Sequence, residues 1–156
     1  MIEIRQARVG DIERIVQLQM EMARETENLL LDRKKVTSGV TGVLSNPNRG
    51  QYWIAEERGD ILGVLLTIPE WSDWRNGTVL WIHSLYVLPE ARRRGIFKKL
   101  YTSLKDRVEK SPALVGLRLY VEKNNKSAQR IYEKLGMNKD HYELYEWLKP
   151  TEPPNE

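Results

Sequence analysis

Five cationic side chains lie within eight consecutive positions, Arg92-Arg93-Arg94-Gly95-Ile96-Phe97-Lys98-Lys99. They stand where a predicted strand turns into a predicted helix, and a helix N-terminus already carries a partial positive charge that favours acids. A bound anion would supply the missing negative charge, and a glycine in such a turn lets backbone N–H groups approach a phosphate closely. The pattern therefore predicts a phosphate-binding turn. The alternative is a solvated basic face on an ordinary helix.

The rest of the composition excludes several kinds of chemistry. The 156 residues contain no Cys, so thiolate nucleophiles, disulfides, iron–sulfur clusters and Cys-type zinc sites are excluded. The two histidines, His83 and His141, are too far apart in sequence for an HExxH helix, and we predict no metal site. The nucleotide motifs GxxxxGK[ST] and GxGxxG are absent from the sequence.

His83 is a candidate general base, because imidazole has an ordinary pKa near 6.5 and titrates around neutral pH. Strict alternation along the predicted strand places it on one face with a row of apolar residues, and a neighbouring bulge would re-aim it. That row comprises Val79, Trp81, Leu85 and Val87. The alternative is a strand histidine whose ring is satisfied by a hydrogen bond.

The segment Glu70-Trp71-Ser72-Asp73-Trp74-Arg75 places two indole rings around a carboxylate near a predicted hairpin. Aromatic faces together with a carboxylate suit a cationic amine. Trp71, Asp73 and Trp74 are therefore candidates for binding an amine substrate. The alternative is that the Trp rings pack under the hairpin while the acids are solvated.

Hydrophobic periodicity predicts an α/β fold with a mixed sheet. We expect an edge strand over 2–8, and a helix that opens at Gly10-Asp11 with Asp11 as its N-cap. Asn76-Gly77 predicts a type I′ hairpin turn, and Ala113–Val121 predicts a central buried strand reached by a right-handed parallel crossover. The other expected elements are helices over 32–44, 95–109 and 125–135, the last with Gly136 at C′, and strands over 51–57, 61–69, 78–88 and 141–148.

Length and charge set the remaining expectations. We expect one domain over residues 1–148 and a disordered, proline-rich tail over 149–156. The net charge of +3 and the lack of a broad basic stripe argue against a nucleic-acid partner. No apolar run approaches the ~20 residues of a membrane-spanning helix, and no signal segment is visible, so we predict no membrane association. The absence of Cys agrees with a cytoplasmic location.

Two motifs make the chain resemble the GCN5-related N-acetyltransferase (GNAT) superfamily. Its [Q/R]-x-x-G-x-[G/A] turn is matched by Arg92 to Phe97, with Phe97 standing where the family usually has Gly or Ala. Its Asn-x-x-Ala-x-x-x-Tyr-x-x-x-Gly pattern is matched at Asn125, Ala128, Tyr132 and Gly136. The predicted order β-α-α-β-β-β-α-β-α-β is also the order of the acyl-CoA N-acyltransferase (GNAT) fold, a mostly antiparallel mixed sheet flanked by helices.

The resemblance implies direct transfer of the acetyl group from acetyl-CoA to a primary amine of a small molecule or peptide, in a ternary complex. It implies that the turn amides bind the CoA diphosphate, that the pantetheine arm pairs with the strand edge as an added strand, and that a backbone N–H near Val87 polarises the thioester. Tyr132 would protonate the departing thiolate. The implied cofactor contacts are Leu85, Tyr86, Val87, Arg92, Arg93, Arg94, Gly95, Ile96, Phe97, Lys98, Asn125 and Ser127. From the residues alone, Tyr132 could instead be a core side chain.

The resemblance also bears on the acceptor and on the alternatives. Glu25 and Glu27 follow the first predicted helix, a region that borders the acceptor site in the family, and His83 stands where related polyamine acetyltransferases often have Glu. Alternative hypotheses are another acyl-CoA donor, or a CoA-binding or nucleic-acid-binding module without turnover. A homodimer is plausible through the predicted last strand and its aromatic residues, Tyr142, Tyr145 and Trp147.

Overall fold

The computed structural model describes residues 1–150. The chain divides into two compact units, Met1–Tyr120 and a second one that begins at Val121, and each is described here by itself. The single domain expected over 1–148 stays a prediction. Most of the expected tail, residues 151–156, lies outside the described residues. Within 1–150, no helix combines the length and apolar character that crossing a bilayer requires.

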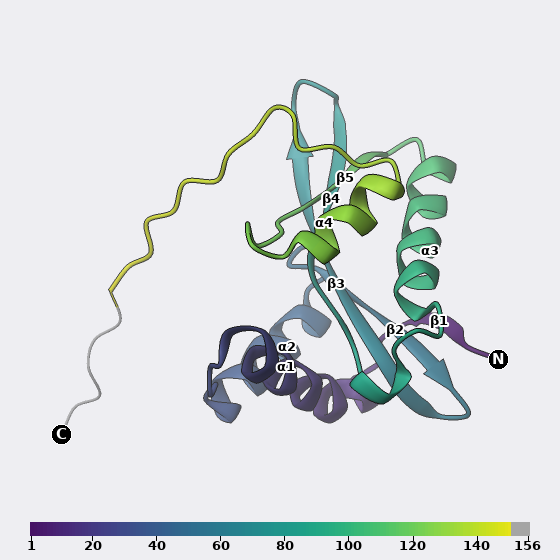
Figure 1. Ribbon diagram of the computed structural model, residues 1–156, viewed down its shortest axis with the longest axis vertical. Helices are drawn as coiled ribbons and strands as arrows, with labels where there is room; N and C mark the ends of the chain where they lie inside the picture. Colours follow the sequence, from purple (N-terminus) through teal and green to yellow (C-terminus); the bar gives the residue numbers. More distant parts are fainter. Residues whose placement is uncertain (151–156) are drawn as a thin grey trace. The chain divides into compact units, whose positions relative to one another are not determined.

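The first unit is a five-stranded sheet with helices on both faces (Figure 1). The strands lie in the order β1-β2-β3-β4-β5, antiparallel except for β5, which is parallel to β4. The predicted α/β class with a mixed, mostly antiparallel sheet is therefore confirmed. The elements are β1 (Glu3–Gln6), α1 (Ile12–Glu27), α2 (Arg33–Ser45), β2 (Gln51–Glu57), β3 (Asp60–Ser72), β4 (Gly77–Val87), α3 (Ile96–Lys110) and β5 (Leu114–Leu119).

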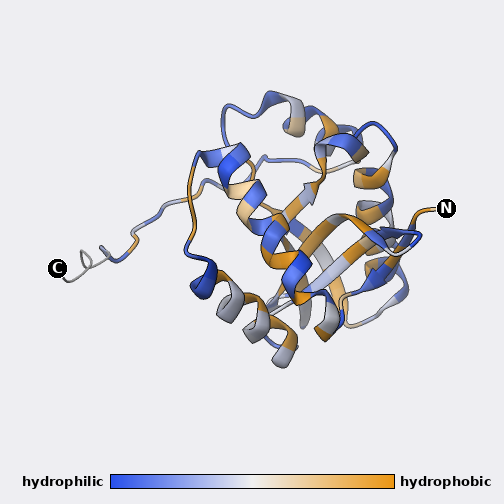
Figure 2. Ribbon diagram, turned by 90° about the horizontal axis from the view of Figure 1, so that it is seen from below, coloured by the Kyte–Doolittle hydropathy of each residue, from blue (hydrophilic) through white to orange (hydrophobic). Residues whose placement is uncertain are grey.

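The core of this unit forms where α1 and α3 cover opposite faces of the sheet. Arg107 of α3 places its guanidinium carbon 4.3 Å from the Trp53 ring centroid, and Glu25 of α1 bonds to Tyr86. Trp53 and Tyr86 pair with the consecutive β3 residues 65 and 64, so their side chains point to opposite faces. Figure 2 shows hydrophobic residues concentrated on the central strands. The largest fully buried side chains include Ile15, Leu18, Ile54, Leu65, Ile96 and Leu100.

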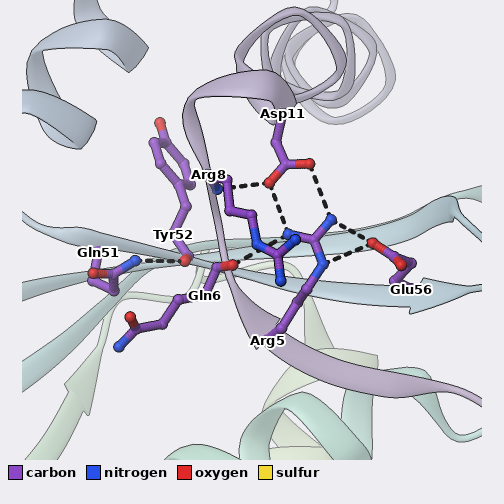
Figure 3. A network of polar contacts seen from close by, with 7 residues as sticks. All are labelled: Arg5, Gln6, Arg8, Asp11, Gln51, Tyr52 and Glu56. Carbon is purple, nitrogen blue, oxygen red and sulfur yellow. Dashed lines mark hydrogen bonds and ion pairs between the residues drawn. The ribbon is translucent and has the colours of Figure 1, made fainter.

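Asp11 precedes α1 as predicted, but its side chain does not cap the helix. Its carboxylate accepts two hydrogen bonds from the Arg5 guanidinium, at 2.8 and 3.0 Å, and one from the Arg8 backbone N–H at 2.7 Å. Arg5 also donates from Nε to Glu56 at 2.7 Å, so this network joins β1, β2 and the start of α1 (Figure 3). A carboxylate binds a charged guanidinium more strongly than neutral amides, so Asp11 bonds to Arg5 instead of capping the helix.

The type I′ turn lies at a different hairpin from the predicted one. Arg58 and Gly59 have φ of 53° and 86° between β2 and β3, which is the two-residue pattern of that turn. Between β3 and β4 the loop has four residues, Asp73 to Asn76, and only Asn76 has positive φ. Gly77 instead permits a close approach, because a Cβ there would lie 2.4 Å from Cγ1 of Val115.

Two strand predictions near the C-terminus are corrected. β5 is an edge strand of the described sheet, and all its residues are half-buried. Residues 141–150 form no strand. A strand needs a neighbour for its backbone groups, and the described part of the second unit, residues 121–150, holds only the helix α4 (Lys126–Lys134). Tyr142, Tyr145 and Trp147, whose pairing or packing was expected to form a dimer, are exposed.

The ends of α4 agree with the sequence pattern. Asn125 is its N-cap and accepts a hydrogen bond from the Ala128 N–H at 3.1 Å. Gly136 has φ of 90° just past the C-terminus, where its N–H bonds to the Glu133 carbonyl.

Candidate functional site

His83 is the extra residue of a β-bulge in β4. Thr67 of β3 pairs with Ile82, whereas the preceding Leu66 pairs with Ser84, so His83 has no partner on β3. Ile82 and Ser84 therefore face opposite sides of the sheet although they are two positions apart. The strict alternation predicted for this strand is wrong across the bulge: Val79 and Trp81 share one face, while Leu85 and Val87 lie on the other.

Beyond the bulge, β4 has a free edge. The ladder to β5 ends at the pair Ile82–Leu119, so among the described residues Ser84 to Val87 pair only with β3. The Leu88 N–H bonds to the Leu62 carbonyl at 2.9 Å. Antiparallel residues alternate in direction, so Val87, next to Leu88, points its own N–H and C=O away from β3. The half of β4 predicted to pair with a cofactor arm is the half that lacks a neighbour.

A short 3-10 helix (Pro89–Ala91) follows β4, and the basic turn comes after it and opens α3. Arg93 and Gly95 both have left-handed φ, 64° and 75°, which coil the backbone tightly before the helix. Lys99 N–H makes the first hydrogen bond back to the Gly95 carbonyl, at 3.0 Å. The N–H groups of Ile96 and Lys98 are among the donors that a helix N-terminus leaves open. A Cβ at Gly95 would meet nothing within 4 Å, so the turn has open space at this position.

Two of the cations in this turn are neutralised within the first unit, which corrects part of the anion argument. Arg92 forms a two-pronged ion pair with Glu25, at 2.7 and 2.8 Å, and Arg94 forms one with Glu57 at 2.6 Å. Within residues 1–150, no carboxylate lies within ion-pair distance of Arg93 or Lys98. Lys99 has no carboxylate partner there either and donates to the Ile2 carbonyl at 3.3 Å. The excess positive charge at the turn is therefore carried by these three exposed side chains.

Glu25 joins α1 to both ends of this turn region. Besides Arg92, its Oε2 accepts a hydrogen bond from the Tyr86 hydroxyl at 2.7 Å. The Arg92 guanidinium, and then the Tyr86 hydroxyl, hold the pKa of the Glu25 carboxyl below its usual value. Burial, followed by the hydrogen bond to Glu25, raises the pKa of Tyr86 to about 12, so its hydroxyl stays protonated. Both residues line an open groove of about 470 Å³ between α1 and the end of β4.

The residues at the bulge have unsatisfied polar groups suited to binding. The hydroxyl oxygen of Ser84 is buried without any hydrogen-bond partner in the described chain. Such an atom costs free energy unless a water or ligand satisfies it. His83 beside it is exposed. A titratable ring and an unpaired hydroxyl thus adjoin the free edge.

The expected acceptor residues are not gathered in one place. Glu25 lies at the turn end of β4. Trp71, near the end of β3, and Asp73 and Trp74, in the loop that follows, lie at the other end of this 11-residue strand, roughly 30 Å away at the usual rise per residue. Trp71 and Trp74 are 62% and 92% exposed, so neither packs under the hairpin. Asp73 accepts a hydrogen bond from the adjacent Trp74 N–H, and Glu27 is exposed at the end of α1.

The remaining predicted residues belong to the second unit. Asn125 caps α4, Ser127 is exposed, and Tyr132 is half-buried on the same helix, with its backbone carbonyl accepting from the Met137 N–H. Their roles toward the cofactor stay predictions. Within residues 1–150, no group of three or more His, Asp or Glu is placed to hold a metal ion.

Sequence reasoning missed Glu57 and Ser84. Glu57 is the last residue of a strand and carries no motif, and its partner Arg94 is 37 positions away. Ser84 becomes notable only through the bulge, which the sequence suggested without locating. The one usable signal for Glu57 was the excess of arginines in the turn, since clustered cations need counter-charges.

These features define a CoA-type acyltransferase fold: a bulged strand, a parallel neighbour that ends at the bulge, and a helix N-terminus beyond the strand end. The pattern of the acetyltransferase (GNAT) family matches residues 12–137, most of the chain, so this protein belongs to that family.

Relatives agree in sequence and in structure. The uncharacterized N-acetyltransferase YhfO of Bacillus subtilis is 28% identical, and the match covers 89% of this chain and 91% of the relative. An uncharacterized N-acetyltransferase of Archaeoglobus fulgidus is 29% identical over 84% of this chain and 89% of its own. The crystal structure of a possible acetyltransferase from Clostridium difficile superposes with a TM-score of 0.91 at 40% identity, covering 97% of this chain and 99% of the other. Family and relatives support a general N-acetyltransferase role.

Proposed function

We propose that this protein transfers the acetyl group of acetyl-CoA to a primary amine of a small molecule or peptide, directly within a ternary complex. The free edge of β4 carries the proposal together with the open amides of the α3 N-terminus, to which a short 3-10 helix (Pro89–Ala91) and the basic turn connect it. A ligand with an amide-bearing arm and a diphosphate matches that sequence of donors and acceptors.

The residues present fit acetyl-CoA. The open N–H groups at Ile96 and Lys98 stand at the start of α3, next to the open position at Gly95. On the unpaired side of β4, Leu85 offers its backbone N–H and C=O and Val87 offers its N–H, because the Val87 carbonyl already accepts from Arg92. Arg93 and Lys98 add the charge that attracts phosphate. When bound, acetyl-CoA supplies an acyl group activated as a thioester.

Residues at the bulge perform the proton transfer in this proposal. An attacking amine must first lose a proton, and His83, exposed beside the free edge, accepts it on its ring nitrogen. Ser84 holds a water or the amine itself through its unpaired hydroxyl. The Val87 N–H is a fixed donor for developing negative charge, and Tyr132 provides the proton for the leaving group.

Calorimetric titration with acetyl-CoA, followed by thiol-release assays, tests the proposal. The amine panel contains a diamine, an amino sugar and a peptide with a free α-amine, and the donor panel contains acetyl-, propionyl- and succinyl-CoA. We expect saturable binding and acetyl transfer to at least one amine. Tight binding without transfer to any of these amines would favour the CoA-binding module, and no binding by folded protein would overturn the proposal.

His83 has its own test. Replacing His83 with Ala is expected to remove the acidic limb of the pH–rate profile, because the group that must be deprotonated there is gone. An unchanged profile would exclude His83 as the base. Acetyl-CoA binding by the variant, measured in parallel, controls for damage to β4.

A further inference from the structure

The two ion pairs of the basic turn differ in what else they hold. Arg94 and Glu57 join the turn to the end of β2. Arg92 and Glu25 join it to α1, but Arg92 also donates from Nε to the Val87 carbonyl at 3.1 Å, and Glu25 also accepts from Tyr86. Both residues of β4 bonded in this way belong to the half with the free edge.

All three nitrogens of the Arg92 guanidinium are engaged. Nη1 and Nη2 face the Glu25 oxygens and Nε faces Val87. A planar fork held at three points has a fixed orientation. Arg92 therefore does not direct its charge at a ligand of the α3 N-terminus. Its position instead fixes the Val87 carbonyl, at the point where the strand edge passes into the turn.

We infer that Glu25 is a positioning residue for the acetyl-CoA site, acting through Arg92 on the end of β4; this rests on the proposed function. By neutralising Arg92 and holding it against Val87, Glu25 fixes the geometry between the free edge and the α3 N-terminus. The cofactor must contact both at once, so a small displacement between them weakens its binding. Contact with phosphate is left to the unpaired cations, Arg93 and Lys98.

The test compares Glu25→Gln with Glu57→Gln. Both substitutions remove one carboxylate charge from an ion pair of the same turn, and the side chains are similarly exposed, with arginines at 43% and 42% and glutamates at 39% and 26%. Pairs this exposed contribute little to folding, so both variants should fold, as thermal unfolding will verify. We expect Glu25→Gln to raise the Kd and the KM for acetyl-CoA about tenfold. The turnover number kcat and the KM for the amine should stay within about twofold, and Glu57→Gln should change none of these values by more than about twofold.

A double-mutant cycle shows whether Glu25 acts through Arg92. If it does, Arg92→Met raises the Kd for acetyl-CoA about as much as Glu25→Gln, and the double variant is no weaker than either single variant. Additive losses would overturn the inference, and so would tighter binding by Glu25→Gln, which would mean that freed Arg92 reaches the diphosphate. Glu25→Asp, which keeps the charge, should recover part of the affinity.

The outcomes separate this inference from the proposed function. If the wild type fails to bind acetyl-CoA, the proposed function fails and the inference with it. If the wild type binds and Glu25→Gln behaves like Glu57→Gln, only the inference is overturned.

Discussion

The two halves of β4, on either side of His83, differ in what surrounds them. From Gly77 to Ile82 the strand has β3 on one side and β5 on the other. From Ser84 to Val87 it has β3 alone, and the opposite edge is open. The first half ends in a loop with exposed indole rings, and the second ends in a turn tied to α1 and β2 by ion pairs.

The comparison indicates that a site forms where a sheet leaves backbone groups unpaired. The paired half is hydrogen-bonded to a strand on each side and serves as a scaffold. The unpaired half exposes backbone donors and acceptors, and neighbouring elements hold it in one shape. The aromatic segment around Trp74 has the residue types that stand out in the sequence. The half with organised polar groups depends instead on residues that no motif marks, such as Glu25 and Ser84.

The largest effect on acetyl-CoA affinity is expected from Gly95→Glu, which obstructs the turn beyond the open half. The carboxylate would enter the space over the α3 amides and repel a diphosphate, a kind of contact that costs several kcal/mol. We expect acetyl-CoA affinity to fall at least about 100-fold, as measured by calorimetry. Gly95→Ala is the control: its Cβ has room, but φ of 75° is strained for Ala, at a cost of about 1 kcal/mol in stability. Equal binding by Gly95→Glu and the wild type would mean that the diphosphate lies elsewhere.

A substitution in the paired half should lower the free energy of unfolding and leave acetyl-CoA binding unchanged. Gly77→Ala places a methyl group 2.4 Å from Cγ1 of Val115 and 3.3 Å from the Ala113 carbonyl oxygen, so β5 must shift. We expect a loss of about 1–3 kcal/mol in the free energy of unfolding, measured by urea denaturation. The folded variant should keep its acetyl-CoA affinity. A large loss of affinity at unchanged stability would show that the two halves are not separable.

Asp11 lies outside both halves of β4, so changing it is a reference that should alter stability without altering cofactor binding. Asp11→Asn leaves the Arg5 guanidinium without its main partner, and we expect a loss of about 1–2 kcal/mol in stability at neutral pH with unchanged cofactor binding. The Arg5 hydrogen bonds hold the pKa of the Asp11 carboxyl below its usual 3.8. The wild-type advantage is therefore complete above pH 3.8 and declines as pH falls through the lowered pKa. An advantage that persisted below that range would exclude the ionised carboxylate as its source.

The smallest effect is expected at the exposed loop. Trp74 is 92% exposed, so Trp74→Ala should change the free energy of unfolding by no more than about 0.5 kcal/mol. We also expect the KM for a small amine to stay within about twofold, because the loop is far from the turn. Steady-state kinetics with the best amine of the panel provide the measurement. A clear rise in that KM would place this loop in the acceptor site, as its residue types suggested.

The elements could be predicted from sequence because their signals are local. Periodicity fixed β2 to the residue, and helix ends such as Asp32 and Gly136 carry their own capping chemistry. The two motifs located the turn and α4. The bulge, the free edge and the ion pairs arise instead from partners far apart in the chain: Glu25 and Arg92 are separated by 67 positions. No short-range pattern specifies such pairs, and the fate of 141–148 likewise depended on whether a neighbouring strand existed.

The bulge at His83 decides which side chains of the open half point toward α1. If β4 alternated without a bulge and His83 itself paired with Leu66, every side chain after it would turn over, so that Tyr86 would face α3 and Val87 would face α1. The Tyr86 hydroxyl would lose Glu25, and two apolar side chains would enter the groove beside α1. Deleting His83 would have no such effect, because Ile82 and Ser84 would become neighbours and keep their partners Thr67 and Leu66. The two surfaces of the open half are therefore set by the register of β4 against β3, which the bulge shifts by one residue.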